Sequence, residues 1–450
     1  MVRALESVQG GALIALSGGP DSTALTYLVS EARPDLKLSL GHVRHGLRED
    51  DVDVATVHRH AEALKLPLAI AEIEVRPSGE GLEAAARVGR HAALRRLASE
   101  AGVAWILLGH TADDQAETVL LRVARGTGIT GLAGMRALRG DLVRPLLRIR
   151  RSDVRRFVAL EGLDAAEDPT NRDPASRRVR VRQTVLPALE TLAPDPVGAL
   201  VRLADLARVD ATYLEAEAAR VARSSIRPYG PARALSTELL AGLDVAVASR
   251  VVRRLLAAVR GSTPVNAGHV DAVLALQAGQ ARDLPGVIVT RGGGWLAAAP
   301  PELPEAGPVT LAVPGVTNWT PAAVSIVAVT GSDSPVQPHD LLSHEALPPG
   351  GNPALGSVAL GGLQQGDLVV RSRRQGDRVT ARAGTRKLQD LFVDAGIPRA
   401  VRDLVPVVTL GDRLLWVPGV TVDVRAESAG RITPTLHLAV TARDQRTRAP

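Results

Sequence analysis

Short apolar runs alternate with amphipathic stretches along the first third of the chain. The apolar runs predict strands at residues 11–16, 36–42, 68–75 and 103–108. The stretches after them have apolar residues at helical spacing and predict helices at residues 21–31, 50–66, 81–101 and 112–125. Strands that alternate with long helices are typical of a parallel sheet covered on both faces. We therefore expect an α/β domain that binds its ligands beyond the carboxyl ends of the strands.

The rest of the chain follows other patterns. Prolines punctuate the sequence around residues 170–197, and helical spacing returns at residues 197–223 and 235–278. Residues 281–360 are rich in glycine and proline with short β-like runs, and from residue 366 such runs flank a predicted helix. The domains that we expect are an α/β domain at 1–190, a helical middle domain at 197–300, a linker with irregular β-like structure at 301–365, and a small α+β domain at 366–440.

The composition is that of an ordinary globular protein, with 45% hydrophobic and 23% charged residues. No apolar run approaches the roughly 20 residues that cross a bilayer, and no secretory signal pattern opens the sequence. We therefore expect a cytoplasmic protein with no membrane association, and nothing in the sequence implies a protein partner. The chain has no cysteine, which excludes disulfides, thiolate metal sites and cysteine nucleophiles.

Positive charge is concentrated in two blocks. The whole chain has a formal charge of +6, with 51 arginines and three lysines. Residues 144–182 have 11 arginines against 6 acidic residues, a net +5, and residues 371–402 have 9 basic residues against 3 acidic ones, a net +6. The other residues therefore sum to −5. Basic blocks on an otherwise acidic chain favour a polyanionic partner such as RNA, although solvated helix faces explain either block equally well.

A polar loop follows the first predicted strand and precedes the first predicted helix. It consists of Ser17, Gly18, Gly19, Pro20, Asp21 and Ser22. Glycines let backbone N–H groups approach an anion, and the start of a helix adds unpaired N–H groups, so the loop predicts a phosphate-binding site. Asp21 would repel phosphate unless a magnesium ion lay between them, which makes Asp21 the candidate magnesium ligand. The alternative is a turn in which Asp21 or Ser22 only caps the helix.

This loop resembles the Ser-Gly-Gly-x-Asp-Ser signature of the N-type ATP pyrophosphatases, the PP-loop family. The resemblance implies a protein that binds ATP, releases pyrophosphate and transfers AMP to a substrate oxygen, after which an amine or sulfur nucleophile displaces the AMP. Branches of this superfamily that use sulfur carriers, iron–sulfur clusters, zinc or a glutaminase depend on cysteine. Because this chain has none, an amine that arrives as a free substrate remains.

Further segments narrow the resemblance to the tRNA(Ile)-lysidine synthase family, and they cover most of the chain. They are residues 42–48 (His-Val-Arg-His-Gly-Leu-Arg), 81–90, 108–118, 125–132, 144–146, 168–187 and 376–419. One departure is Val179, which stands where the family usually has asparagine. The resemblance implies a carbon–nitrogen ligase that adenylates the wobble cytidine of isoleucine tRNA with a CAU anticodon. Free L-lysine would then displace AMP from C2 of that base to give lysidine, with ATP and Mg²⁺ as cofactors.

The same resemblance implies roles for residues outside the loop. The catalytic candidates are Asp21, His110 and Arg87. We expect ATP to contact His42 and Arg90 as well as the loop, and lysine to contact Asp113, Asp114 and Glu117, whose alternative is a solvated acidic first helical turn. The candidates for tRNA binding are Arg178, Arg182, Arg373, Arg374, Arg378 and Lys387. A solvated helix face is the alternative for Arg178 and Arg182.

Two other functions are compatible with the sequence. The chain could adenylate a different base or a small-molecule acceptor, in which case turnover would not need lysine. It could also be a nucleotide-dependent tRNA-binding protein without catalysis. The intact Ser17, Asp21, Ser22 and His110 argue against this second alternative.

Overall fold

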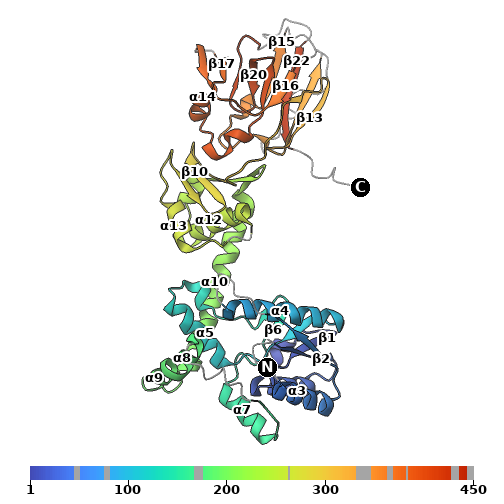
Figure 1. Cartoon of the computed structure of the whole chain (residues 1–450). Coiled ribbons are helices and arrows are strands. Elements are labelled where there is room, and N and C mark those ends of the chain that lie inside the picture. The colour runs from blue at the N-terminus through green and yellow to red at the C-terminus, as the bar shows by residue number, and fades with distance from the viewer. Residues whose placement is uncertain are drawn as a thin grey trace. The chain divides into compact units, whose positions relative to one another are not determined.

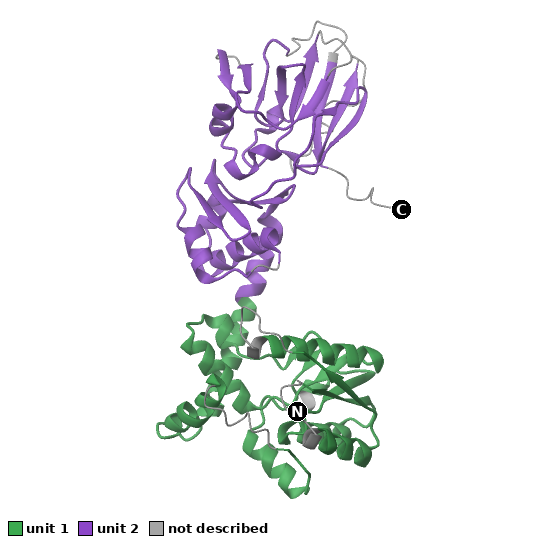
Figure 2. Cartoon of the chain, viewed as in Figure 1, with its two compact units in different colours: residues 1–213 green, residues 214–450 purple. Residues whose placement is uncertain are grey.

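The chain divides into two compact units, an N-terminal unit of residues 1–213 and a C-terminal unit of residues 214–450 (Figure 2). We describe them from a computed structural model that covers residues 1–44, 51–74, 82–166, 176–261, 264–330, 346–361, 368–381, 384–426 and 435–442. No helix in these ranges combines the length and the apolar composition of a membrane span.

The N-terminal unit is built on a six-stranded sheet in the order β3-β2-β1-β4-β6-β5 (Figure 1). Its strands are β1 (Gly11–Ala15), β2 (Lys37–Arg44), β3 (Leu68–Glu72), β4 (Trp105–Leu107), β5 (Leu138–Arg139) and β6 (Leu142–Val143). Neighbouring strands are parallel except for the antiparallel β5–β6 pair. The predicted parallel sheet is therefore confirmed. Because β1 lies between β2 and β4, the strand order reverses beside it, and this switch point is where such sheets bind ligands.

Helices cover both faces of this sheet. They include α2 (Pro20–Ala32), α3 (Asp51–Leu64), α4 (Leu82–Glu100), α5 (Ala112–Ala124) and α7 (Arg151–Leu160). Ala12 and Ile14 of β1 pack with α2, α3 and α7, whereas Leu13 packs with α4 on the other face. Successive side chains of a strand point to opposite faces, so a strand covered on both sides needs a continuous apolar run. Residues 11–16, from which β1 was predicted, form such a continuous apolar run.

The second half of the N-terminal unit is helical. Besides the short α1 (Val2–Leu5), it contains α6 (Ile129–Leu132), α8 (Arg177–Arg180), the π-helical turn η2 (Val181–Val185), α9 (Leu186–Glu190) and the start of α10 (Pro196–Ser225). Apolar residues of α5, η2, α9 and α10 form one small core. The compact N-terminal unit thus includes the start of α10, and the end of the α/β domain at residue 190 stays a prediction.

The first part of the C-terminal unit combines the predicted helices with an antiparallel sheet. The helices are the end of α10, α11 (Thr237–Ala241), α12 (Val245–Arg260) and α13 (Ala267–Leu274). The sheet has the order β7-β8-β11-β10-β9, with strands β7 (Arg227–Tyr229), β8 (Ala232–Ser236), β9 (Ala281–Leu284), β10 (Val287–Gly292) and β11 (Trp295–Ala299). α12 packs its apolar face on this sheet. The sequence predicted β10 as a β-like run but not the rest of the sheet.

The remaining residues form two larger sheets and a hairpin. One sheet has the order β12-β16-β19-β20-β21, the other has the order β13-β14-β22-β15, and β17 pairs with β18. The strands are β12 (Val309–Thr310), β13 (Gly315–Trp319), β14 (Val324–Thr330), β15 (Ser357–Gly361), β16 (Leu368–Arg371), β17 (Arg378–Ala381), β18 (Gly384–Lys387), β19 (Val407–Leu410), β20 (Arg413–Val417), β21 (Thr421–Val422) and β22 (Thr435–Ala442). The helical segments are η5 (Pro353–Leu355), α14 (Leu388–Asp394) and η6 (Arg399–Leu404).

The segment at 301–365 is not a simple linker. Its described residues contribute β12 to one sheet and β13, β14 and β15 to the other. One hydrophobic core extends from Tyr229 and Ala234 through these strands to Phe392 and Trp416. This arrangement could not be predicted from the sequence, because β14 and β15 pair with β22, which lies far along the chain. Glycines and prolines also interrupt the apolar alternation in the segment from β14 to β15. The finer division of the chain at residues 300 and 365 stays a prediction.

Candidate active site

The polar loop of residues 17–22, which we call the PP-loop, connects the end of β1 to the start of α2. Gly18 has a φ of +84°, a left-handed conformation that favours glycine. The Ser22 hydroxyl accepts a hydrogen bond from the Ser17 backbone N–H at 3.1 Å and donates one to the Gly19 carbonyl at 2.9 Å. No side chain caps the N-terminus of α2, which starts after Gly19. The loop is thus held in shape by its own serine, and the first N–H groups of α2 stay available to an anion.

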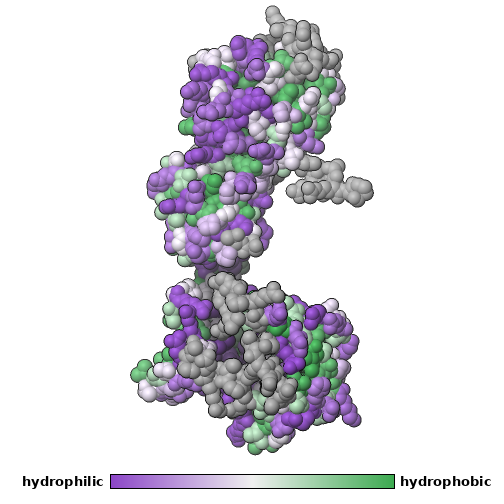
Figure 3. Space-filling view, in the orientation of Figure 1, coloured by the Kyte–Doolittle hydropathy of each residue, from purple (hydrophilic) through white to green (hydrophobic). Residues whose placement is uncertain are grey.

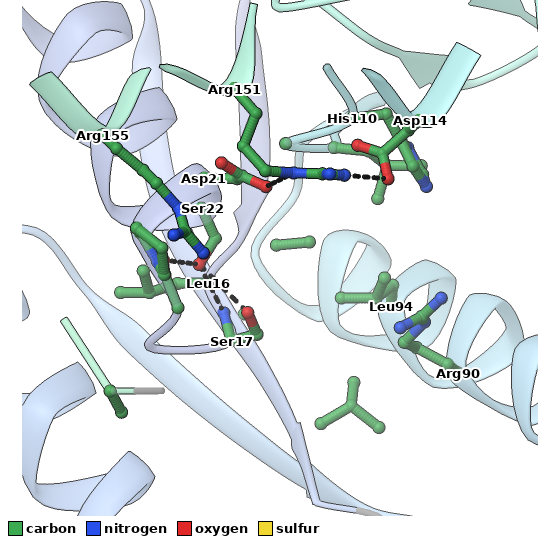
Figure 4. A pocket seen from close by; sticks show the side chains of 18 of the residues that line it. Leu16, Ser17, Asp21, Ser22, Arg90, Leu94, His110, Asp114, Arg151 and Arg155 are labelled. Atoms are coloured by element: carbon green, nitrogen blue, oxygen red, sulfur yellow. Dashed lines mark hydrogen bonds and ion pairs between the residues drawn. The ribbon is translucent and has the colours of Figure 1, made fainter. Parts of the chain in front are cut away.

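A cavity of about 430 Å³ lies at the switch point between β1 and β4, and we call it the main cavity (Figure 4). The predicted site residues that line it are Ser17, Gly19, Pro20, Asp21, Ser22, Arg90, His110, Asp114 and Arg182. These residues come from the PP-loop, α4, the end of β4, α5 and η2. Residues that are far apart in the sequence therefore surround one cavity, at the edge of the sheet where ligands were expected.

The pKa of the Asp21 carboxyl group is strongly perturbed in the main cavity. Burial raises the pKa of Asp21 to about 6, although the nearby positive charge of Arg151 acts in the opposite direction. Its Oδ1 atom is buried without a hydrogen-bond partner, and Oδ2 lies 3.6 Å from Nε of Arg151. A buried carboxylate oxygen without a partner is costly in an empty site, and it suits a residue whose partner is a cation brought by the ligand.

Arg151, the first residue of α7, connects three acidic residues at this site. Its Nη2 lies 3.0 Å from Oδ1 of Asp114 and its Nη1 lies 3.1 Å from Oε1 of Glu117, while Asp21 is on its other side (Figure 4). Its backbone N–H donates to Oδ2 of Asp113 at 2.7 Å. The sequence analysis missed Arg151. A signal was present, because cations at the N-terminus of a helix oppose the helix dipole, and α7 begins with two adjacent arginines at its N-cap and first position.

Glu117 is completely buried and carries three ion pairs. Its carboxylate lies 3.1 Å from Nη1 of Arg151, 3.0 Å from Nε of Arg178 and 2.8 Å from Nε of Arg182. Arg178 also donates to the Thr118 hydroxyl at 3.1 Å. Arg178 and Arg182, two of the six residues predicted to bind tRNA, thus turn inward. Glu117, which was predicted to bind lysine, already has three cationic partners. Both roles stay predictions, and each would require these ion pairs to rearrange.

His110 lies just after β4, and Asp114 lies in the first turn of α5. Burial lowers the pKa of His110, so its imidazole is neutral near pH 7. Asp114 accepts hydrogen bonds from the N–H and hydroxyl of Thr111, at 2.8 and 2.9 Å, in a capping box. Burial works against ionisation of Asp114, but Arg151, the other nearby charges and the Thr111 backbone hydrogen bond together outweigh it, and the pKa of Asp114 lies below its ordinary value. The site therefore combines a neutral imidazole with an ionised carboxylate.

The other predicted residues of the N-terminal unit lie outside the main cavity. His42 is buried, and its Nδ1–H donates to the Leu16 carbonyl at 2.8 Å, so it supports the strand end from behind the PP-loop. His45 and Arg48 of the same motif lie outside the described residues, as do residues 168–171. Asp113 accepts from the Arg151 backbone and faces Arg150 at 3.5 Å. Arg87 lines a second cavity.

The predicted residues of the C-terminal unit lie on and around the β17–β18 hairpin. Arg378 and Lys387 are directly opposite each other in the register of the two strands, and both are exposed. Arg374 is also exposed, whereas Arg373 pairs with Asp403 at 2.6 Å. Like charges directly opposite each other destabilise a pair of strands. The hairpin therefore presents positive charge at Arg378 and Lys387, whereas its Arg386 pairs with Asp394 at 2.6 Å.

Gly109 allows the end of β4 to approach the PP-loop. A Cβ atom at this position would lie 2.9 Å from the Asp21 carbonyl oxygen and 3.1 Å from the Ser22 nitrogen, both of which are backbone atoms. We expect Gly109→Ala to lower ATP affinity roughly tenfold and stability by about 1–3 kcal/mol, because the backbone has to move. Equilibrium binding of ATP measures the first effect. Gly128→Ala, where a Cβ meets nothing within 4 Å, is the control; equal losses in both variants would contradict the steric argument.

Domain families and curated relatives match most of this chain. The PP-loop domain family matches residues 3–189, and the TilS substrate C-terminal domain family matches residues 368–436. A tRNA(Ile)-lysidine synthase of Symbiobacterium thermophilum is 36% identical over 94% of this chain and 93% of its own length. One of Solibacter usitatus is 32% identical over 90% of this chain and 92% of its own. The crystal structure of a TILS C-terminal domain aligns with 30% of this chain and 96% of that chain at 28% identity, with a TM-score of 0.24.

Proposed function

Because the chain belongs to the tRNA(Ile)-lysidine synthase family, a family of ATP-using ligases that act on tRNA, we propose that it forms lysidine through an adenylated tRNA. In the first step, O2 of the wobble cytidine of the CAU anticodon attacks the α-phosphorus of ATP, and pyrophosphate leaves. In the second step, the ε-amine of lysine attacks C2 of the base, and the C–O bond to AMP breaks. The observation that carries this proposal is the main cavity, where the PP-loop and His110 face Asp114.

The PP-loop side of the main cavity suits the triphosphate. The backbone around Gly19, the serine hydroxyls and the start of α2 are anion donors, and Arg155 and Arg182 add positive charge to the lining. Mg²⁺ usually binds one or two protein carboxylates together with the phosphates of its nucleotide. The orphaned Oδ1 of Asp21 fits that role. Bound there, Mg²⁺ would neutralise charge on the phosphates as pyrophosphate leaves.

Asp114 is our candidate to receive the lysine ammonium group. It is ionised, lines the main cavity and has one cationic partner, Arg151, at 3.0 Å. We propose that Asp114 binds the ammonium group and orients the amine, which attacks C2 after it has lost a proton to solvent. Burial keeps His110 neutral, so the imidazole near Asp114 adds no positive charge that would repel the ammonium group. Arg90, which also lines the main cavity, has a guanidinium group suited to a carboxylate or a phosphate. Asp113 and Glu117 would have an indirect role, because both of them bind Arg151 and fix its position.

The C-terminal unit is our candidate for contacts with the body of the tRNA. Hydrophilic residues gather over β17 and α14 on the face seen in Figure 3. Arg374, Arg378 and Lys387 are exposed in this region. Exposed cations suit the phosphate backbone, and such contacts make affinity fall as the salt concentration rises.

The proposed role of Asp21 predicts a pH dependence. Burial raises the pKa of Asp21 to about 6, and only the ionised form would bind Mg²⁺. We therefore expect kcat/KM for ATP to fall about tenfold for each pH unit below roughly pH 6. Because Arg151 lowers the pKa of Asp21, the variant Arg151→Gln should move this acidic limb to higher pH. A limb at the same pH in both proteins would assign the titration to the nucleotide rather than to Asp21.

The test of the proposed function is lysine incorporation. The protein is incubated with ATP, Mg²⁺, radiolabelled lysine and isoleucine tRNA with a CAU anticodon. We expect labelled tRNA, with one AMP and one pyrophosphate released for each lysine attached. Pyrophosphate release without a need for lysine would favour a different acceptor. Binding of tRNA without pyrophosphate release would favour a protein without catalysis, and equal labelling of methionine tRNA would contradict the proposed specificity.

A further inference from the structure

The N-terminal unit contains a second cavity of about 390 Å³, which we call the arginine cavity. Its basic lining residues are Arg87, Arg122, Arg136, Arg139, Arg144 and Arg208. They come from α4, α5, the segment from α6 to β6, and α10. No acidic side chain is among the residues that line this cavity. An enclosed surface with one sign of charge focuses the electrostatic field and favours a ligand of opposite charge.

At least half of the arginines of the arginine cavity have no carboxylate partner within the described residues. Within the described residues, no carboxylate forms an ion pair with Arg136, Arg139 or Arg144, whereas Arg208 pairs with Asp205 at 2.5 Å. Arg144 is only 2% exposed, donates from Nη1 to the Arg136 carbonyl at 3.0 Å, and leaves Nε buried without a partner. Burial and the charges of Arg87 and Arg139 lower the pKa of Arg144 to about 10, so it stays charged at neutral pH. An unpaired buried cation is costly, and a bound anion would offset the cost.

The arginine cavity adjoins the main cavity. Arg87 lines the former and Arg90 lines the latter, and they are three residues apart on α4, so they lie on neighbouring turns of one helix face. Arg144 follows β6, which pairs with β4, and the end of β4 leads to His110 of the main cavity. A strand of nucleic acid whose base enters the main cavity therefore has its backbone within reach of these arginines.

We infer that the arginine cavity binds phosphodiester groups of the RNA strand beside the base that reacts in the main cavity. This inference rests on the proposed function, and it names the phosphates that hold the reacting nucleotide in place. Guanidinium groups form paired hydrogen bonds to phosphate oxygens, and phosphate contacts set the register of a nucleic acid on a protein. Pyrophosphate would be a less suitable ligand, because it is released at the PP-loop. Arg87, predicted from the sequence to be catalytic, is a positioning residue in this scheme.

The first test removes charge from the rim of the arginine cavity. Arg136 and Arg139 are exposed, so Arg136→Gln/Arg139→Gln preserves the packing around the buried Arg144. We expect its affinity for isoleucine tRNA to fall roughly tenfold or more at 0.15 M salt, and the slope of log K against log salt to decrease by about 1.4–1.8, as for two lost phosphate contacts. ATP affinity should not change. The control Arg59→Gln/Arg96→Gln removes the same charge from two exposed arginines that pair with carboxylates.

The second test identifies which phosphates are bound. A tRNA with neutral methylphosphonate linkages on both sides of the wobble nucleotide should bind the wild-type protein more weakly. Binding of this modified tRNA should weaken little further when the protein is Arg136→Gln/Arg139→Gln, because the modified linkages and the variant each remove the same contact. Fully additive losses would show that the arginines contact other phosphates and would overturn the inference.

Two other outcomes would also overturn it. An equal loss of tRNA affinity in the control variant would mean that only net charge matters. An unchanged tRNA affinity together with weaker product inhibition by pyrophosphate would assign the arginine cavity to pyrophosphate. If the wild-type protein itself fails to bind isoleucine tRNA, the proposed function fails first, and that result is distinct from a failure of the variant to differ from wild type.

Discussion

Asp21→Asn is expected to reduce ATP-dependent pyrophosphate release by roughly 10³-fold while tRNA affinity stays within about twofold of wild type. The substitution keeps the size of the side chain but removes the charge that would hold Mg²⁺ against the phosphates, and such electrostatic contributions are often worth this factor. Pyrophosphate release measures the effect on adenylation, and filter binding of labelled tRNA measures affinity. Asp21 lies in the main cavity, away from the basic residues that we assign to the RNA backbone.

The stability of Asp21→Asn separates this role from a structural one. The folded protein raises the pKa of Asp21 to about 6 from an ordinary value of 3.8. The protonated Asp21 carboxyl group therefore stabilises the folded state at low pH, and this stabilisation is lost as the group ionises when the pH rises through 6. A neutral asparagine avoids that loss, so the variant should be at least as stable as wild type at pH 7.5. Asp35→Asn, at an exposed aspartate, is the control. Undiminished pyrophosphate release from Asp21→Asn would refute the magnesium role.

Glu117→Gln is expected to lower the free energy of unfolding of the N-terminal unit by about 3 kcal/mol, the usual cost of removing one partner from buried ion pairs. The carboxylate is fully buried and lies within 3.1 Å of guanidinium nitrogens from three arginines. Glutamine cannot balance three positive charges, so α5, α7 and η2 would lose the group that connects them. Hydrogen exchange of α5 and η2 amides in the full chain would locate the loss, and urea unfolding would measure its size.

The same variant decides between two roles for Glu117. If Glu117 holds the ammonium group of lysine, as the sequence predicted, Glu117→Gln should raise the KM for lysine strongly and leave stability close to wild type. If it holds the arginines, stability should fall and the KM for ATP should rise with the KM for lysine, because Arg151 and Arg182 border the whole main cavity. Glu100→Gln, at an exposed glutamate paired with Arg96, is the control for loss of a surface ion pair.

The sequence was sufficient to predict the parallel sheet and the loop that lines the main cavity. Residues 11–16 were predicted as a strand because β1 is apolar on both faces, and the glycines of the PP-loop identified the turn that follows it. Both features are local, since periodicity and turn chemistry lie within a few neighbouring residues. The resemblance to one family then supplied the candidates along α4 and α5, which periodicity could not have singled out.

The contacts within the site could not be predicted in the same way. Arg178 and Arg182 have the four-residue spacing of an exposed basic face, and only the folded chain turns them towards Glu117. The adjacent Arg150 and Arg151 were a local signal, but nothing in the sequence near them showed that Arg151 lies between Asp21 and Asp114. In the C-terminal unit, β14 pairs with β22 about a hundred residues later, and a pairing at that distance leaves no local signal. Long-range partners were therefore the main source of error.

The position of Arg151 between Asp21 and Asp114 has a thermodynamic consequence. With no ligand bound, one guanidinium group serves both the nucleotide side and the proposed amino-acid side of the main cavity. A cation that binds Asp21 frees Arg151 to interact more strongly with Asp114, and a cation that binds Asp114 frees it for Asp21. Affinities that depend on one shared group are coupled, and the coupling free energy has to be the same in both directions. The affinity of the protein for lysine should therefore depend on whether nucleotide and magnesium are present, by the same factor with which lysine alters their binding.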